Sequence, residues 1–201
     1  SDGDQLKDLF KRISKIKLSD DATELMKISI LTNAYSPQKN ITKEEFSKFK
    51  SDWLIKNSDL DLVEEYLIKN QIFHKNTKLS KFLVDQYLSQ FELEKVCEIF
   101  SKNLKPINET YLSKFNIYCL ISNGKKNEAQ LNLDLKKELG FKEEYFEKKI
   151  NYLLGFTSEI DEEVSELSIL DFHLAHITNP RFEFEPKEST SKIIWKYLSS
   201  A

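Results

Sequence analysis

Two histidines near the end of the chain are the residues whose type and spacing most resemble a reactive centre. His173 and His176 lie three residues apart, which places both imidazoles on one face of a helix, as two ligands of a zinc ion would be. A metal-dependent enzyme is therefore one interpretation. Neither a third ligand nor the glutamate and five-residue span of the zinc-protease motif stands near them. We expect two partly exposed histidines packed on a neighbouring helix, and no bound metal.

Two cysteines could form the second reactive pair. Cys97 and Cys119 fall on two helices that we expect to pack together. A disulfide would form between them if the protein is exported to an oxidising compartment. Buried free thiols that fill gaps in a core are the more common arrangement, so free thiols are our prediction.

Other catalytic patterns do not stand out. There is no glycine-rich phosphate loop, nucleophile elbow or ordered Ser/His/Asp set, and the carboxylate pairs Glu44-Glu45 and Glu162-Glu163 are adjacent in sequence and do not converge on one helical face. The chain is therefore predicted not to be an enzyme and to hold no cofactor.

The composition restricts the class of fold and of partner. Of 201 residues, 40% are hydrophobic and 12% aromatic, which is enough for a core, while only four glycines and four prolines argue against a sheet with many turns. A net charge of −3 makes nucleic acid or an anionic membrane surface a poor partner. The composition predicts an all-α protein.

The location of the protein is less constrained. The sequence contains no run of about 18 apolar residues, the length needed to insert directly into a membrane, so we expect a soluble chain. Its Lys-, Asn- and Ile-rich composition is typical of an AT-rich bacterial genome, which leaves the bacterial cytoplasm and the periplasm open. The chain begins at Ser1 without Met, which suggests a piece of something longer.

Hydrophobic periodicity and capping residues predict about eleven helices. They are expected at 4–16, 21–34, 43–56, 60–69, 77–90, 93–102, 109–122, 126–139, 142–154, 166–177 and 190–199. Gly140 and Gly155 stand where a left-handed C-terminal cap requires a residue without a side chain.

Several helix starts carry polar caps. Thr42 and Glu45 form the pattern of a capping box, in which each side chain accepts a hydrogen bond from the other residue's backbone N–H. Asn108 is expected to cap the helix that begins near residue 109. Ser165 or Glu166 is expected to open the helix that carries the two histidines.

An internal repeat is the strongest pattern in the chain. The tripeptide Ser-Lys-Phe occurs three times at an interval of 33 residues, at Ser47-Lys48-Phe49, Ser80-Lys81-Phe82 and Ser113-Lys114-Phe115. Apolar positions downstream match at the same interval, as do the turn positions Ser58, Phe91 and Gly124. Each copy is predicted to be a helix, a short turn and a second helix. Because such a hairpin cannot bury its apolar face alone, we expect the copies to stack into a right-handed solenoid with a concave face.

This unit resembles the tetratricopeptide repeat, a helix pair of about 34 residues. The segment Gly124-Lys125-Lys126-Asn127-Glu128-Ala129 is similar to that family's turn and second-helix start. The likeness covers about residues 43–140 and implies a tetratricopeptide-repeat-like (TPR-like) α-solenoid. It divides the chain into an N-terminal helical cap (1–41), three helix-hairpin repeats (42–140), and a degenerate repeat with a C-terminal helical segment (141–201).

The resemblance also implies a binding surface, because this family lines its concave face with fixed positions of each first helix. The residues carried over to that face are Lys48, Lys81, Lys114, Ile55, Leu88, Tyr111, Tyr118 and Ile121. A column of lysines beside apolar side chains could bind an acidic peptide. The alternative, and the more common arrangement, is that the lysines are solvated and paired within their own helices, Lys48 with Asp52 and Lys81 with Asp85.

Together these features predict a non-catalytic helical-repeat scaffold that binds a protein or peptide partner on its concave face. The alternative is the solenoid arm of a larger exported cell-envelope protein whose activity lies outside this chain. No sequence feature indicates an oligomeric state.

Overall fold

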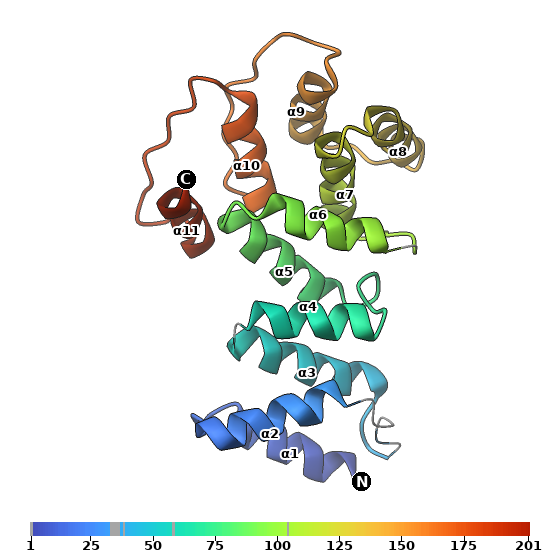
Figure 1. Ribbon diagram of the computed structural model, residues 1–201, viewed down its shortest axis with the longest axis vertical. Coiled ribbons are helices and arrows are strands. Elements are labelled where there is room, and N and C mark those ends of the chain that lie inside the picture. The colour runs from blue at the N-terminus through green and yellow to red at the C-terminus, as the bar shows by residue number, and fades with distance from the viewer. Residues whose placement is uncertain (1, 33–36, 38, 58, 104) are drawn as a thin grey trace. The chain divides into compact units, whose positions relative to one another are not determined.

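The computed structural model describes residues 2–32, 37, 39–57, 59–103 and 105–201, and within them the chain forms eleven α-helices and no strand (Figure 1). The helices are α1 (Gly3–Ile13), α2 (Asp20–Leu31), α3 (Lys43–Asn57), α4 (Leu60–Lys69), α5 (Thr77–Ser89), α6 (Leu93–Lys102), α7 (Thr110–Ser122), α8 (Lys126–Glu138), α9 (Glu144–Leu154), α10 (Ile169–Thr178) and α11 (Lys192–Ser200). The predicted all-α class is confirmed. None of the helices in the described residues has the length and apolar content needed to cross a membrane.

Local capping chemistry places most helix boundaries where the sequence predicted them. Thr42 and Glu45 form the expected capping box, with each backbone N–H donating to the other side chain at 2.8 and 3.0 Å. Gly140 and Gly155 have φ of 90° and 86°, the left-handed conformation that favours glycine. The predicted helix at 21–34 ends at Leu31, and its last two predicted residues lie outside the described residues.

Two predicted caps are wrong. Glu109 caps α7 in place of Asn108, because its carboxylate accepts a hydrogen bond from the Leu112 N–H at 2.8 Å. Ser168 caps α10 in place of Ser165 or Glu166, through a bond of 3.0 Å from the Asp171 N–H to its hydroxyl.

Residues Ser1–Asn70 form the first of two compact units and contain α1 to α4. Phe10 of α1 stacks on Phe49 of α3 with ring centroids 3.4 Å apart. The buried ammonium of Lys50 donates to the carbonyl of Ile30 at 3.0 Å and so caps the C-terminal end of α2. The boundary of this unit falls between α4 and α5, inside the stretch predicted to hold three repeats.

Residues Gln71–Ala201 form the second unit, in which α7 is central. Helices α5, α6, α8 and α9 all pack against α7. Helix α10 packs against both α5 and α9, and α11 packs against α5 and α10 (Figure 1). The last two helices of the chain therefore both pack on α5, the first helix of the α5–α6 pair.

Two helix pairs of this unit share their backbone details at an interval of 33 residues. The helix ends at Ser89 and Ser122 match, as do the starts of α6 and α8. At the turns, Phe91 and Gly124 have φ of 60° and 75°, and the next N–H donates to the carbonyl five residues back, at 3.0 and 2.8 Å. Ser58, the turn position of the first predicted repeat, lies outside the described residues.

Candidate functional site

The three lysines of the predicted column lie at matching positions on α3, α5 and α7, but their surroundings differ. Lys48 is exposed, Lys81 is half-buried and Lys114 is buried, with 6% of its surface accessible. The phenylalanines that follow them also differ, since Phe115 is fully buried whereas Phe49 and Phe82 are half-buried. Lys114 and Phe115 are therefore not part of an open surface.

Lys114 is part of a buried ion pair. Its ammonium lies 2.9 Å from the Asp171 carboxylate of α10, 3.5 Å from Glu143, and 5.3 Å from the ring centroid of Phe146. Asp171 also accepts a hydrogen bond from the Ser168 hydroxyl at 2.8 Å. The prediction that Lys114 faces an open concave surface is wrong, because α10 covers it.

The apolar and aromatic members of the predicted surface are mostly covered as well. Tyr111, Tyr118, Leu88 and Ile121 are all buried, and Ile55 is half-buried. The chain itself covers these two helices, since α9 packs on α7 and both α10 and α11 pack on α5. These four buried side chains cannot contact a partner in this conformation.

Lys81 pairs across helices and not within its own. Its ammonium lies 3.3 Å from Glu109 and 5.2 Å from the ring centroid of Tyr111. Asp85, the predicted partner of Lys81, accepts a hydrogen bond from the Tyr111 hydroxyl instead. Burial raises the pKa of Asp85 to about 6, although the Tyr111 hydrogen bond and the charge of Lys81 oppose this shift.

Lys48 lines an open groove in the N-terminal unit. The groove has a volume of about 380 Å³ and lies between α1 and α3. Its apolar lining comes from Phe10, Phe49 and the buried Trp53, and its polar lining includes Lys11. Within the described part of the chain, Lys48 forms no ion pair, and the expected pair with Asp52 is not observed. The groove is the candidate binding site of this chain.

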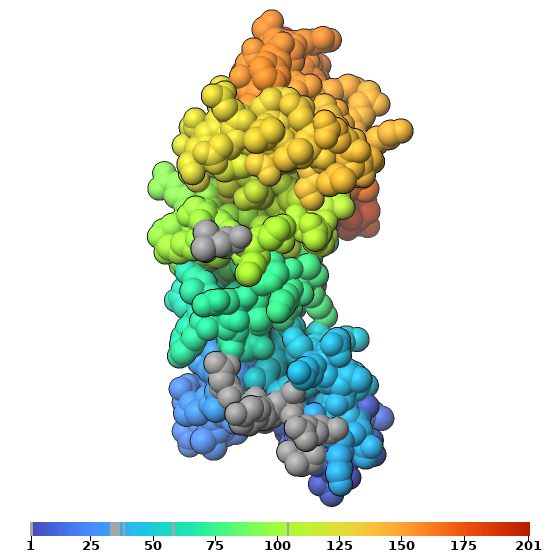
Figure 2. Space-filling model, turned by 90° about the vertical axis from the view of Figure 1, so that its right-hand side faces the viewer, coloured from blue at the N-terminus to red at the C-terminus, as the bar shows by residue number. Residues whose placement is uncertain are grey.

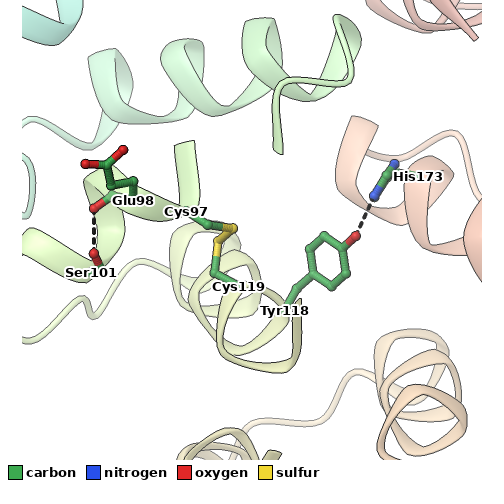
Figure 3. The surroundings of a disulfide bond; sticks show 6 residues. All are labelled: Cys97, Glu98, Ser101, Tyr118, Cys119 and His173. Carbon is green, nitrogen blue, oxygen red and sulfur yellow. Dashed lines mark hydrogen bonds between the residues drawn. A yellow bond between two sulfur atoms is a disulfide. The ribbon is translucent and has the colours of Figure 1, made fainter. Parts of the chain in front are cut away.

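The two cysteines form a disulfide that joins consecutive helix pairs. Cys97 of α6 and Cys119 of α7 are bonded, with Cα atoms 5.2 Å apart (Figure 3). The prediction of two free thiols is therefore wrong. The packing of α6 on α7 was expected, but the choice of free thiols followed from their being the more common arrangement in a core, and the two cysteines lie close enough to bond.

The residue before Cys119 points the other way and begins a chain of hydrogen bonds. In Figure 3, Tyr118 extends away from the disulfide toward α10, where its hydroxyl lies 2.7 Å from Nε2 of His173. Nδ1 of His173 lies 2.9 Å from the Tyr197 hydroxyl of α11, and Nδ1 of His176 lies 2.7 Å from the same hydroxyl. The chain links α7, α10 and α11.

One arrangement of protons satisfies every group in this chain. Tyr118 donates to Nε2 of His173, Nδ1–H of His173 donates to Tyr197, and Tyr197 donates to Nδ1 of His176. In the reverse direction the Tyr118 hydroxyl would need another acceptor, which the hydrogen bonds of the described residues do not supply. Both imidazoles are then neutral.

Burial has the matching effect on the histidines. It lowers the pKa of His173 to about 4 and also lowers the pKa of the half-buried His176. His173 is thus buried and not partly exposed as predicted, while His176 agrees with the prediction. Both ring nitrogens of His173 are occupied by tyrosine hydroxyls, and no cluster of three or more potential metal ligands occurs among the described residues. The geometry favours a packing role.

A second buried lysine of the C-terminal unit was not anticipated from the sequence. Lys149 of α9 donates to the backbone carbonyls of Asp161 and Glu163, the latter at 2.9 Å, and pairs with the Asp161 carboxylate at 3.3 Å. The hydroxyl of Tyr145 donates to the carbonyls of Glu163 and Asp171. The extended acidic segment at 156–168 is therefore held along α9. The acidic run was visible in the sequence, but its partner was not.

The outer side of α8 carries an exposed apolar stripe. Leu131, Leu135 and Leu139 are spaced four residues apart and are between 49% and 84% exposed. This helix lies on the face of the C-terminal unit that Figure 2 presents in yellow. Four asparagines lie among the residues that line a cavity of about 280 Å³ beside it, together with Leu135 and Leu139.

Comparisons with known proteins found no matching family model, no matching curated protein and no matching solved structure.

Proposed function

We propose that this chain is a non-catalytic helical-repeat scaffold that binds a protein or peptide partner. The observation that carries the proposal is the pair of equivalent helix hairpins, α5–α6 and α7–α8. In both turns one residue, Phe91 or Gly124, has a left-handed backbone conformation, and the same backbone hydrogen bond follows it. Hairpins of this kind bury their apolar faces by stacking, which leaves extended surfaces for partners. The proposal includes α3–α4 as the first repeat and a right-handed, TPR-like arrangement of all three.

The environments of the buried ionisable groups support a structural role for the C-terminal unit. Lys114 is neutralised by Asp171, and His173 is held between two tyrosine hydroxyls. These partners come from the chain itself. We therefore assign binding to the open groove at Lys48 and not to the cluster around α10.

A second candidate is that the chain forms the arm of a larger exported protein that acts at the cell envelope. The Cys97–Cys119 disulfide favours it, because disulfides persist in oxidising compartments and are rare in a reducing cytosol. Mass spectrometry of alkylated protein from the native source tests this candidate. Two free thiols in that protein would contradict it.

The scaffold proposal is tested by affinity capture with the complete protein, followed by reconstitution. We expect a captured protein, once purified, to bind the chain in a defined stoichiometry in isothermal titration calorimetry. The proposal would be contradicted if none of the purified candidates bound the chain saturably.

A further inference from the structure

Three lysines in the C-terminal unit each contact an aromatic ring and a carboxylate in a similar geometry. Each of three ammonium groups lies 5.1–5.3 Å from an aromatic ring centroid and 2.9–3.3 Å from a carboxylate oxygen. The sets are Lys81 with Tyr111 and Glu109, Lys114 with Phe146 and Asp171, and Lys149 with Tyr145 and Asp161. Two of these three carboxylates come from the chain that follows the last hairpin.

The groove in the N-terminal unit has the lysine and the aromatic rings of this arrangement. Phe10 and Phe49 stack on each other and line the groove, as does the buried Trp53. The exposed Lys11 and Lys48 also line the groove and form no ion pair within the described residues.

The remaining charged groups of the groove leave it with an excess of one positive charge. Its lining holds three lysines and two carboxylates. The carboxylate of Glu45 is bound by Lys7 at 2.9 Å and by the Thr42 N–H, and Lys56 donates to the Ser14 carbonyl at 2.7 Å. Asp52 also lines the groove and has an interaction of its own. Among the described residues, neither carboxylate of the groove forms an ion pair with Lys48, so Lys48 lacks the acidic partner of the recurring arrangement.

We propose that this groove binds an acidic segment of a partner protein, in which an apolar or aromatic side chain is flanked by Asp or Glu. The apolar side chain occupies the space beside Phe10, Phe49 and Trp53, and a flanking carboxylate pairs with Lys48. This rests on the proposed scaffold function and adds the location of the site and the chemistry of the partner. The volume of about 380 Å³ is in the lower range of ligand pockets, which suits side chains of an extended peptide.

The chain contains a segment with this chemistry. Phe182 and Phe184 pack on Phe172 of α10 with centroids 5.5 and 4.8 Å apart, while Glu183 and Glu185 between and after them are exposed. The alternation of Phe and Glu thus places the rings against a helix and leaves the carboxylates exposed. It also provides the sequence of a synthetic probe.

The test is a fluorescence titration with two blocked peptides, acetyl-Gly-Glu-Phe-Glu-Phe-Glu-Gly-amide and the same peptide with Lys in place of every Glu. The complete protein carries Trp195→Phe, so that Trp53 is its remaining tryptophan. We expect the acidic peptide to change Trp53 emission saturably and to bind at least about tenfold more tightly than the basic peptide at low salt.

Variants of Lys48 test whether its charge is responsible. Lys48→Ala should weaken binding of the acidic peptide about two- to fivefold, Lys48→Arg should retain it, and Lys48→Glu should weaken it by more than about tenfold. Lys43→Glu is the matched control, because Lys43 is exposed on the same helix and does not line the groove. It should leave the affinity within about twofold.

Three results would overturn the proposal: no change in Trp53 emission at millimolar acidic peptide, equal affinity for both peptides, or equal effects of Lys48→Glu and Lys43→Glu. The scaffold function is judged separately. A purified partner that binds the Lys48→Glu variant as tightly as the unmodified protein would leave the scaffold function standing and reject this site.

Discussion

Lys48 in the N-terminal unit and Lys114 in the C-terminal unit occupy the same place in the same tripeptide, yet one is exposed beside an open groove and the other is buried against Asp171. The difference arises from the segment that follows the helix pairs. In the C-terminal unit α10 supplies the carboxylate and covers the lysine, whereas the N-terminal unit has no equivalent helix in the described residues. A repeated sequence position thus acquires its role from the chain that is packed against it.

Lys114→Ala should have the largest effect on stability. It leaves the Asp171 carboxylate buried without its cation, which costs about 3–5 kcal/mol. Urea unfolding followed by Trp195 in a Trp53→Phe background reports the C-terminal unit. Lys48→Ala, followed by Trp53, should cost less than about 0.5 kcal/mol, as is usual for an exposed side chain. Equal costs at the two positions would refute the contrast.

Reduction of the disulfide should destabilise only the C-terminal unit. Cys97 and Cys119 are 22 residues apart, and a closed loop of this length contributes about 3 kcal/mol in the chain-entropy model. We expect the Trp195 transition to move to lower urea in dithiothreitol and the Trp53 transition to stay in place. The double variant Cys97→Ser, Cys119→Ser is the control, because reductant should not change it further.

The pH dependence of the C-terminal unit should contain two opposing contributions. His173 has a pKa of about 4 in the folded state, below its usual 6.5. Its contribution to the free energy of unfolding is therefore present above pH 6.5 and is lost as the pH falls toward 4. Asp85 has a folded pKa of about 6, above its usual 3.8, so its burial costs stability above pH 6 and that cost disappears on acidification. Each contribution reaches about 3 kcal/mol.

Substitutions separate these two contributions. Asp85→Asn should make the C-terminal unit lose about 2–3 kcal/mol more than the unmodified protein between pH 6.5 and 4, and His173→Gln should have the opposite effect. Urea unfolding at several pH values, followed by Trp195, measures both. The N-terminal unit lacks both groups, since all three histidines lie beyond residue 70. Parallel pH profiles for the two variants would rule out this assignment.

Lys50→Met should have a smaller effect than the changes in the C-terminal unit. It removes the hydrogen bond from the buried ammonium to the Ile30 carbonyl and should destabilise the N-terminal unit by about 1 kcal/mol. Removal of a desolvated charge, whose pKa is lowered by burial, offsets part of the loss. Trp53 fluorescence in urea measures the change, with Lys43→Met as the exposed control. A gain in stability would show that the cap is not net stabilising.

Most of the helices could be predicted because their boundaries depend on neighbouring residues. The capping box of Thr42 and Glu45 and the left-handed glycines act within a few positions of sequence. The candidate site could be predicted only in part. Lys48 was identified through the repeat, but the groove beside it requires α1 to pack on α3 through Phe10 and Phe49.

The all-α class, the helix boundaries with local caps, and the interval of 33 residues that reappears in the turns at Phe91 and Gly124 could therefore be read from local sequence. The tertiary structure alone decided which lysine is buried, that the cysteines are joined, and that His173 lies between two tyrosines. The reason is distance along the chain: Lys114 and Asp171 are 57 residues apart, and Tyr118 and His173 are 55. Burial and pairing of such groups depend on contacts that no local pattern encodes.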